Sequence, residues 1–374
     1  MASSPRTSIA HLSDIHVAHA TSNLKRLGRL LSPSGPGEGL VDVVTRLVMS
    51  SWFERRALGE PLMRSAHLKH RYDPRQLSAV LQSVREQKVD HVILTGDLTE
   101  MGAPSEMREA MAALDAFGWK GPNLTLMPGN HDRLNFRAVA DFRSIACDRD
   151  YPLLNRITDD LFAIAVDSTA WGAELDWRDM MTMNARGRIL VSDVEKIDKM
   201  LASLPPGAGC ILCTHHHVID LPPDGYVDDW AGKADARLSG KAEGSEALID
   251  VAEARKVRLI LFGHRHRATR DAFSIRGIPA ACSGAVTRAD SEGRLRYRIF
   301  EFEGANLVES RWVTITEDMV HAAPPVTAPV EGDDLKVTVK VSPDNLQQQM
   351  SDLTAKRKEM DRKILERMAK GKKG

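Results

Sequence analysis

Residues 124–132 read Leu-Thr-Leu-Met-Pro-Gly-Asn-His-Asp, a short apolar run that ends in three side chains able to bind a metal or move a proton. An uninterrupted apolar run of about four residues is typical of a strand buried on both faces of a sheet. In α/β sheets, ligands bind just beyond the carboxyl ends of the strands. The segment therefore predicts a strand that delivers Asn130, His131 and Asp132 to a functional edge of a sheet.

The same pattern recurs along the chain. Apolar runs end in Asp14 and His16 after residues 8–12, in Asp97 after 91–95, in His215–His217 after 209–214, and in His264 and His266 after 257–262. A further run covers 161–166, and runs at 296–302 and 308–316 indicate a closing hairpin. Helical periodicity at 76–88, 104–117, 192–204 and 245–256 separates the runs, so we expect an α/β fold. Ser192 and Glu195 have the spacing of a capping box for the third helix.

The composition excludes several classes of protein. The 374 residues carry 51 basic and 51 acidic side chains, and this balance argues against a nuclease or other nucleic-acid binder, whose affinity depends on neutralising phosphates. An apolar fraction of 43% is typical of a globular protein, and no apolar run is long enough to span a membrane. Residues 1–10 lack the pattern of a secretory signal, so the expected location is the cytoplasm.

The four cysteines are too few for a disulfide scaffold in a chain of this length. Cys210 and Cys213 have the spacing of half a zinc site, but the sequence holds no second pair with similar spacing. We therefore interpret these two residues as buried thiols within a strand.

The side chains at the strand ends indicate a site for two metal ions. Aspartate, histidine and one asparagine amide suit transition ions such as manganese, iron, zinc or cobalt, whereas calcium prefers oxygen donors alone. The set supplies too many donors for one tetrahedral ion, and two ions that share a carboxylate would use them economically.

In chain order, the motifs are Asp14-x-His16, Gly96-Asp97, Gly129-Asn130-His131-Asp132, a strand-end His215 and Gly263-His264-x-His266. Together they resemble the motifs of the calcineurin-like metallophosphoesterase superfamily, and most of all its class III cyclic-nucleotide and general phosphodiesterase branch. The resemblance covers residues 8–316. It implies an α/β fold, a four-layer α-β-β-α sandwich of two mixed sheets, with an inserted cap segment and a C-terminal tail.

The resemblance also implies a role for each residue of the set. Asp14, His16 and His266 would bind the first ion, Asp97 would bridge both ions, and Asn130, His215 and His264 would bind the second. A hydroxide that bridges the ions would attack phosphorus while His131, oriented by Asp132, assists the leaving group. His216 is the alternative to His215 within the triplet 215–217. Arg133 and Arg265, which adjoin the motifs, either contact phosphate oxygens or belong to the solvated surface.

The activity that the resemblance implies is metal-dependent hydrolysis of a phosphodiester. The alternatives are a lipid pyrophosphatase like those that act on UDP-diacylglucosamine, and a binding module on the same fold that has lost catalysis. One well-known branch of the lipid enzymes carries arginine in place of His131, which distinguishes this chain from that branch. No metal ligand of the motif set is missing, which argues against a module without catalysis.

Two segments depart from the regular α/β pattern. Residues 17–73 lengthen the connection after His16 and either cap the site or form a surface excursion with a small core of its own. Their apolar and arginine-rich stretch at 40–60 would suit a phospholipid-like substrate or peripheral contact with the inner face of a membrane. We expect a catalytic domain over 1–320, a linker over 321–343 and a polar tail over 344–374. The tail is either helical or disordered, and its partly heptad-spaced apolar residues would allow homo-oligomers.

Overall fold

The computed structural model describes residues 5–18, 73–100, 102, 104–133, 138–169, 186–220, 241–266, 273–289 and 294–324. Most of the inserted segment 17–73, including 40–60, lies outside these ranges, as do the linker from residue 325 onwards and the tail 344–374. The expectations for those segments stay predictions. Within the described ranges, no helix is long and apolar enough to cross a membrane.

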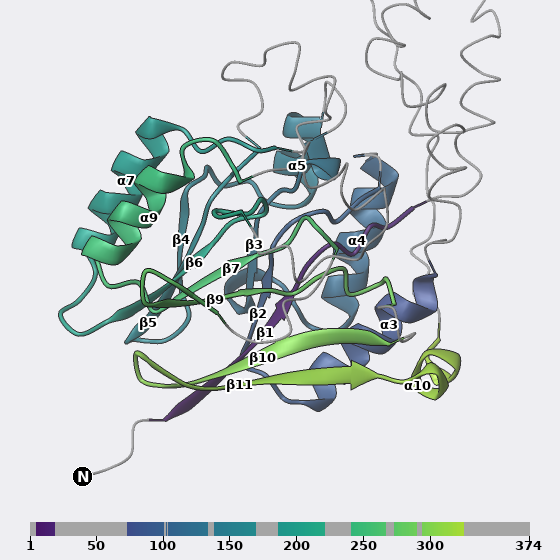
Figure 1. Cartoon of the computed structure of the whole chain (residues 1–374). Coiled ribbons are helices and arrows are strands. Elements are labelled where there is room, and N and C mark those ends of the chain that lie inside the picture. The colour runs from purple at the N-terminus through teal and green to yellow at the C-terminus, as the bar shows by residue number, and fades with distance from the viewer. Residues whose placement is uncertain are drawn as a thin grey trace, which may run out of the picture. The chain divides into compact units, whose positions relative to one another are not determined.

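Two mixed sheets form the centre of the fold (Figure 1). The first has the strand order β11 (Asn306–Ile315), β10 (Leu295–Glu303), β1 (Arg6–Leu12), β2 (His91–Leu94) and β3 (Leu124–Leu126). The second has the order β4 (Leu153–Arg156), β5 (Leu161–Ala165), β6 (Gly209–Cys213), β7 (Leu259–Phe262), β9 (Ile278–Cys282) and β8 (Phe273–Ile275). Strands β1 to β3 run parallel, as do β5, β6, β7 and β9, whereas the outer strands pair antiparallel. Every apolar run singled out in the sequence forms one of these strands.

Helices cover the outer face of each sheet, which confirms the predicted four-layer sandwich. The first sheet packs against α3 (Pro74–Glu86), α4 (Pro104–Ala116), α5 (Ala138–Ile145) and α10 (Glu317–Ala322). The second packs against α7 (Val191–Ala202) and α9 (Ser245–Ala254), which lie side by side in Figure 1. A third apolar cluster, with Ile9 and Ile93 from one sheet and Ile211 from the other, fills the space between the sheets. Short 3₁₀ turns flank β3, at Gly121–Asn123 and His131–Arg133.

The local sequence explains where α3 begins. The side chain of Asp73 caps the helix by accepting a 2.9 Å hydrogen bond from the backbone N–H of Arg75, and Pro74 occupies the first turn. The apolar face expected for this helix is fully buried, at Leu77, Val80, Leu81 and Val84. Burial of this face is the main reason for the helix to form, because isolated helices of this length are marginal in water.

The capping box expected at Ser192 is wrong. Helix α7 begins one residue earlier, at Val191, and its N-cap Leu190 makes no side-chain capping bond. The backbone before the helix is held extended by a 2.8 Å bond from the N–H of Ile189 to the carbonyl of Glu243. A long-range contact, and no side-chain capping bond at Leu190, therefore precedes the helix.

Helix α10, which the sequence pattern did not predict, follows β11. Thr316 caps it by accepting a 3.4 Å hydrogen bond from the backbone N–H of Met319. Met319 and Val320 pack against the first core cluster.

The interpretation of Cys210 and Cys213 as buried thiols is confirmed. Both lie in β6, are buried and form no disulfide. Cys210 packs into the apolar cluster under α7 and α9, whereas Cys213 lies between the sheets. Burial raises the pKa of the Cys210 thiol to about 12, which keeps it protonated and unreactive.

Candidate metal centre

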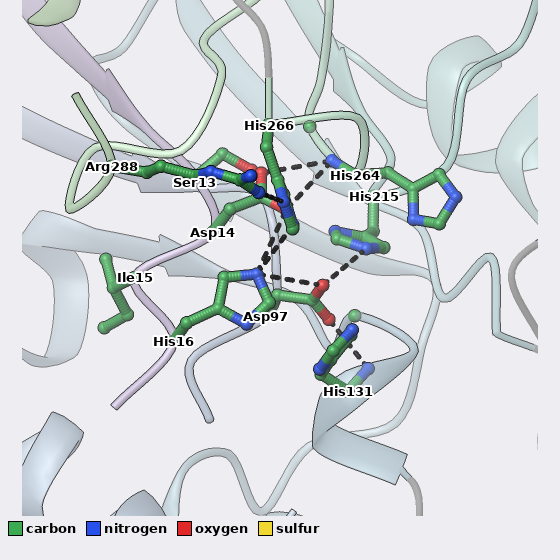
Figure 2. Close-up of polar contacts among 12 residues, drawn as sticks. Ser13, Asp14, Ile15, His16, Asp97, His131, His215, His264, His266 and Arg288 are labelled. Atoms are coloured by element: carbon green, nitrogen blue, oxygen red, sulfur yellow. Dashed lines mark hydrogen bonds and ion pairs between the residues drawn. The ribbon is translucent and has the colours of Figure 1, made fainter. Parts of the chain in front are cut away.

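The ends of five strands bring the sequence motifs together. Asp14 and His16 follow β1, Asp97 follows β2, Asn130 and His131 follow β3, His215 follows β6, and His264 and His266 follow β7. Most of these side chains appear in Figure 2, where they point toward one another. Both sheets therefore contribute donors to one place, although as many as 250 residues of chain separate a contacting pair.

One group of donors, which we call the outer half-site, consists of Asp14, His16 and His266. Nε2 of His266 lies 3.4 Å from Oδ1 of Asp14 and 2.8 Å from Nε2 of His16. Nε2 of His16 lies 3.6 Å from Oδ2 of Asp97. These four side chains place their ligand atoms within 4.8 Å of one another.

A second group, the inner half-site, consists of Asn130, His215 and His264. Oδ1 of Asn130 lies 3.0 Å from Nε2 of His215 and 3.0 Å from Nδ1 of His264. Nε2 of His215 lies 3.3 Å from Oδ2 of Asp97. The same carboxylate oxygen therefore faces both half-sites.

The state of Asp97 tests whether these residues fit two metal ions. Its Oδ1 accepts a 2.8 Å hydrogen bond from the backbone N–H of His131, but its Oδ2 is buried without a hydrogen-bond partner among the described residues. Burial raises the pKa of Asp97, but the neighbouring His215 and His131 rings outweigh it and hold the pKa well below its ordinary value. A buried, charged oxygen between two groups of imidazole, carboxylate and amide donors fits a ligand shared by two transition ions.

The backbone at these ligands is unusual. Five residues have φ in the left-handed region: Asp14 (55°), His16 (45°), Asp97 (53°), His264 (77°) and His266 (55°). Side-chain-bearing residues rarely adopt this conformation and keep it only where the surroundings hold it. Here the N–H of Asp14 bonds the carbonyl of Gly96 at 3.0 Å, and the N–H of His16 bonds that of Asp97 at 3.0 Å. Gly129 approaches so closely that a Cβ would lie 2.1 Å from Oδ1 of Asp97, so only glycine fits.

The geometry favours His215 over His216 as the ligand. Nδ1 of His215 donates to the carbonyl of Thr95 at 2.7 Å, which leaves the lone pair of Nε2 facing the inner half-site. Nδ1 of His216 lies 2.9 Å from Oγ of Ser168, although its ring also comes within 4.8 Å of the inner half-site. Nε2 of His217 lies 3.9 Å from the thiol of Cys282, and its ring packs on Phe262.

His131 lies beside the half-sites, but Asp132 does not orient it as expected. Nδ1 of His131 donates to the backbone carbonyl of Glu100 at 2.8 Å. The carboxylate of Asp132 instead accepts hydrogen bonds from the backbone and hydroxyl of Thr99 and from the N–H of Gly129. Burial and the nearby charge of Asp97 raise the pKa of Asp132 to about 6. Asp132 therefore ties the loops after β2 and β3 together, and a backbone carbonyl holds the histidine.

Arg133, one of the two arginines considered for a contact with phosphate, does not belong to the solvated surface: its guanidinium is buried, pairs with Asp167 at 3.0 Å and lies over the ring of Phe142. Arg265 is buried as well, which excludes a place on the solvated surface. Burial, and after it the positive charge of Arg265, lower the pKa of His217.

Two residues at the site had not been singled out in the sequence. Oε2 of Glu100 lies 3.0 Å from Nδ1 of His16, and Nη1 of Arg288 lies 3.0 Å from Nδ1 of His266. Glu100 follows the motif residue Asp97 by only three residues, and this closeness was a signal available in the sequence. Arg288, which follows β9, had no such signal, because its partner lies 22 residues away on another strand end.

Comparisons with known proteins show the family of the chain. A family model described as calcineurin-like phosphoesterase matches residues 7–268. A cAMP/cGMP dual specificity phosphodiesterase of Mycobacterium tuberculosis is 28% identical over 218 residues. The match covers 56% of this chain and 59% of the length of that relative. A probable cyclic nucleotide phosphodiesterase of Rhodococcus erythropolis is 28% identical over 256 residues, which are 66% of this chain and 75% of the relative.

Among solved structures, a dimetal phosphatase from Danio rerio superposes with a TM-score of 0.49 and 14% identity, over 83% of this chain and 99% of that chain. The family model is the stronger finding, because it matches well over half of the sequence and includes every strand-end motif from Asp14 to His266. This chain belongs to the calcineurin-like phosphoesterase family.

Proposed function

We propose that the chain is a metal-dependent phosphoric ester hydrolase that cleaves phosphodiesters. The observation that carries the proposal is the buried Oδ2 of Asp97, which makes no hydrogen bond within the described part of the chain and faces the outer and inner half-sites at once, with His131 directly beside it. Membership in the family supports ester hydrolysis. The names of the two bacterial relatives favour a cyclic nucleotide as the substrate class.

The residues that would hold the ions are Asp14, His16 and His266 on one side, Asn130, His215 and His264 on the other, and Asp97 between them. When bound, the two ions would supply positive charge to the phosphoryl oxygens and lower the pKa of a water toward neutrality. Manganese, iron, zinc and cobalt all suit this donor set. The protein's own contribution is to hold the donors in place before the ions and the substrate arrive.

His131 is suited to give a proton to the leaving oxygen. Because its Nδ1 already donates to the carbonyl of Glu100, the ring becomes a donor at Nε2 only in its protonated form. The carboxylate of Glu100 lies 4.0 Å from the same Nδ1. A histidine held at Nδ1, whose protonated ring would donate from Nε2 to the leaving oxygen, meets the geometric need of a general acid.

The test compares Mn²⁺-dependent hydrolysis of bis-p-nitrophenyl phosphate with that of the monoester, followed by 3′,5′-cAMP and 3′,5′-cGMP. We expect diester cleavage well above monoester cleavage, and turnover of at least one cyclic nucleotide. Preference for the monoester would move the assignment to a phosphatase. Two bound ions without turnover of any of these compounds would contradict the proposal and favour a binding module.

The variant His131→Ala separates the proton donor from the metal ligands. We expect it to keep two bound ions and to lose about 10²–10⁴-fold in turnover, the usual contribution of a general acid. The loss should be smaller for a substrate whose leaving group is a good one, such as p-nitrophenolate, than for a cyclic nucleotide. Turnover equal to that of the unmodified chain on both substrates would overturn the role of His131.

A further inference from the structure

Strand β5 runs parallel to β6 in the second sheet, but none of the metal-ligand candidates follows it. The residues after it, Asp167, Ser168 and Thr169, form a segment that we call the β5 turn. Oδ1 of Asp167 accepts a 2.9 Å hydrogen bond from the backbone N–H of Thr169 and a 2.6 Å bond from its hydroxyl. The N–H of Arg188 bonds the carbonyl of Ser168 at 2.8 Å. The β5 turn is therefore held both from within and by a neighbouring segment.

The first residue of the β5 turn contacts the loop of the first sheet that carries Asn130 and His131. Oδ2 of Asp167 lies 3.0 Å from Nη2 of Arg133, and these side chains are 15% and 6% exposed. Arg133 is the last residue of the 3₁₀ turn that begins at His131, and its N–H bonds the carbonyl of Asn130 at 3.3 Å. Because the ion pair is largely shielded from water, salt screens it little. It connects the second sheet to the short segment that presents Asn130 and His131.

The second residue of the β5 turn contacts the loop after β6, which carries His215. Oγ of Ser168 accepts a 3.0 Å hydrogen bond from the backbone N–H of His216 and lies 2.9 Å from Nδ1 of the same residue. Ser168 and His216 are both completely buried. Since His216 directly follows His215 in the chain, Ser168 restrains the backbone from which His215 reaches the inner half-site.

We propose that Asp167 and Ser168 are positioning residues that set the distance between the two loops supplying the inner half-site, one with Asn130 and one with His215. The two sheets share no strand, and the apolar cluster between them attracts without direction. An ion pair and hydrogen bonds depend on direction as well as distance, so they determine where the strand ends lie relative to one another. The inference rests on the proposed function, since it concerns how the metal centre of that function is held together.

The test uses the full chain and three variants that break the contact with the first sheet. Arg133→Met changes the loop after β3, whereas its effect is measured in the loop after β6, so it is the decisive variant. Asp167→Asn breaks the same ion pair from the β5 turn. The double variant Arg133→Met/Asp167→Asn removes both buried charges and so avoids the cost of leaving one of them unpaired.

Asn155→Ala is the matched control. It removes a 3.0 Å hydrogen bond from Nδ2 of Asn155 to Oγ1 of Thr125, which also joins the two sheets but lies outside the loops that carry the donors. Two quantities are compared in every variant. Backbone hydrogen exchange is followed by mass spectrometry, and Mn²⁺ binding is followed by electron paramagnetic resonance of the free ion.

We expect all three variants to exchange faster than the unmodified chain at residues 214–217, with no change at 295–315. Mn²⁺ should bind about 2–30-fold more weakly at one of the two ions, the scale on which residues without a contact to the ligand alter its binding. The double variant should lose no more than the weaker-binding single variant, because both substitutions break one link. Asn155→Ala should change neither quantity.

Unchanged exchange at 214–217 in Arg133→Met and Asp167→Asn would overturn the proposal. Exchange that rises equally at 295–315 would also overturn it, because that result indicates a general loss of stability. Unchanged Mn²⁺ affinity at both ions, in a chain that binds two, would do the same. Hydrogen exchange needs neither metal nor turnover. A chain that binds no ions, or cleaves no diester, would therefore refute the proposed function while exchange still decides the role of the β5 turn.

Discussion

The two half-sites share Asp97 but are held in different ways. In the inner half-site, Asn130 and His215 are 4% and 0% exposed, and a backbone carbonyl, that of Thr95, holds the ring of His215. In the outer half-site, the side chains of His16 and His266 are 13% and 26% exposed, and charged side chains hold their rings. The ring of His215 is therefore held by the main chain of the sandwich, whereas the rings of His16 and His266 are held by the side chains of Glu100 and Arg288.

This difference predicts an order of loading. A ring held by the main chain loses less freedom on binding an ion than rings held by side chains. We therefore expect a first Mn²⁺ ion at the inner half-site and a second, weaker one at the outer half-site. Substitutions at the shared aspartate and in each half-site either remove the difference in metal binding between the half-sites or make it measurable.

The largest effect is expected at the residue that both half-sites share. Asp97→Asn should lower the affinity for both ions and reduce diester hydrolysis by at least about a thousandfold, since it removes the charge between them. Metal analysis after dialysis and the diester assay give the two readouts. Asp198→Asn, an exposed carboxylate that pairs with Arg255, is the matched control and should change neither. Retention of two ions by the Asp97 variant would show that the half-sites do not share this ligand.

The next effect is confined to the inner half-site and decides between two neighbouring histidines. His215→Ala should lose about one ion per chain, because the lost donor has no mobile replacement. His216→Asn, which keeps a polar partner for Ser168, should retain both ions. Metal content at equal free Mn²⁺ distinguishes the two variants. If the contents are reversed, His216 is the ligand and the inner half-site has been assigned to the wrong residue.

A smaller effect is expected when the outer half-site loses a supporting carboxylate. Glu100→Ala should weaken one ion by about 10–100-fold, the usual cost of removing the group that holds a ligating histidine. Glu100→Gln keeps an acceptor for Nδ1 of His16 and should lose less. Titration with Mn²⁺ should show the change in the weaker binding phase. An equal loss in both phases would mean that the outer and inner half-sites are not independent.

The smallest effect concerns the sandwich rather than either half-site. Burial lowers the pKa of His91, which bonds the hydroxyl of Thr125 at 2.8 Å, to about 4. Since the unfolded chain takes up this proton near pH 6.5 and the folded chain does not, the stability is fully present above pH 6.5. It should fall by up to about 1.4 kcal/mol per unit as the pH decreases toward 4.

Urea unfolding of the metal-free chain at pH 7, 6 and 5 measures this slope. His91→Gln keeps a polar partner for Thr125 but cannot take up the proton, so it should remove one histidine's share of the slope. Burial also lowers the pKa of His11, to about 3, so His11 should still contribute to the slope in that variant. An unchanged slope in the glutamine variant would show that His91 does not oppose acid unfolding.

Much of the fold and of the candidate site is present in the sequence, for a physical reason. A strand buried on both faces must be apolar throughout, and the residues just after it must turn, so β1, β2, β3, β6 and β7 and the polar residues that follow them are visible locally. The ligand motifs lie within these short segments. Their convergence could be expected because parallel strands end at the same edge of a sheet.

The sequence alone did not determine the contacts whose partners come from distant segments. Asp132 looked like the partner of its neighbour His131, but its acceptor oxygens are occupied by Thr99 and Gly129. Arg133 looked free to bind phosphate until Asp167, from the other sheet, was seen beside it. Local pattern thus determined which residues gather at the site, because strand ends and motifs are short-range features. Only the tertiary structure decided which donor meets which acceptor, since each pair joins segments that folding alone brings together.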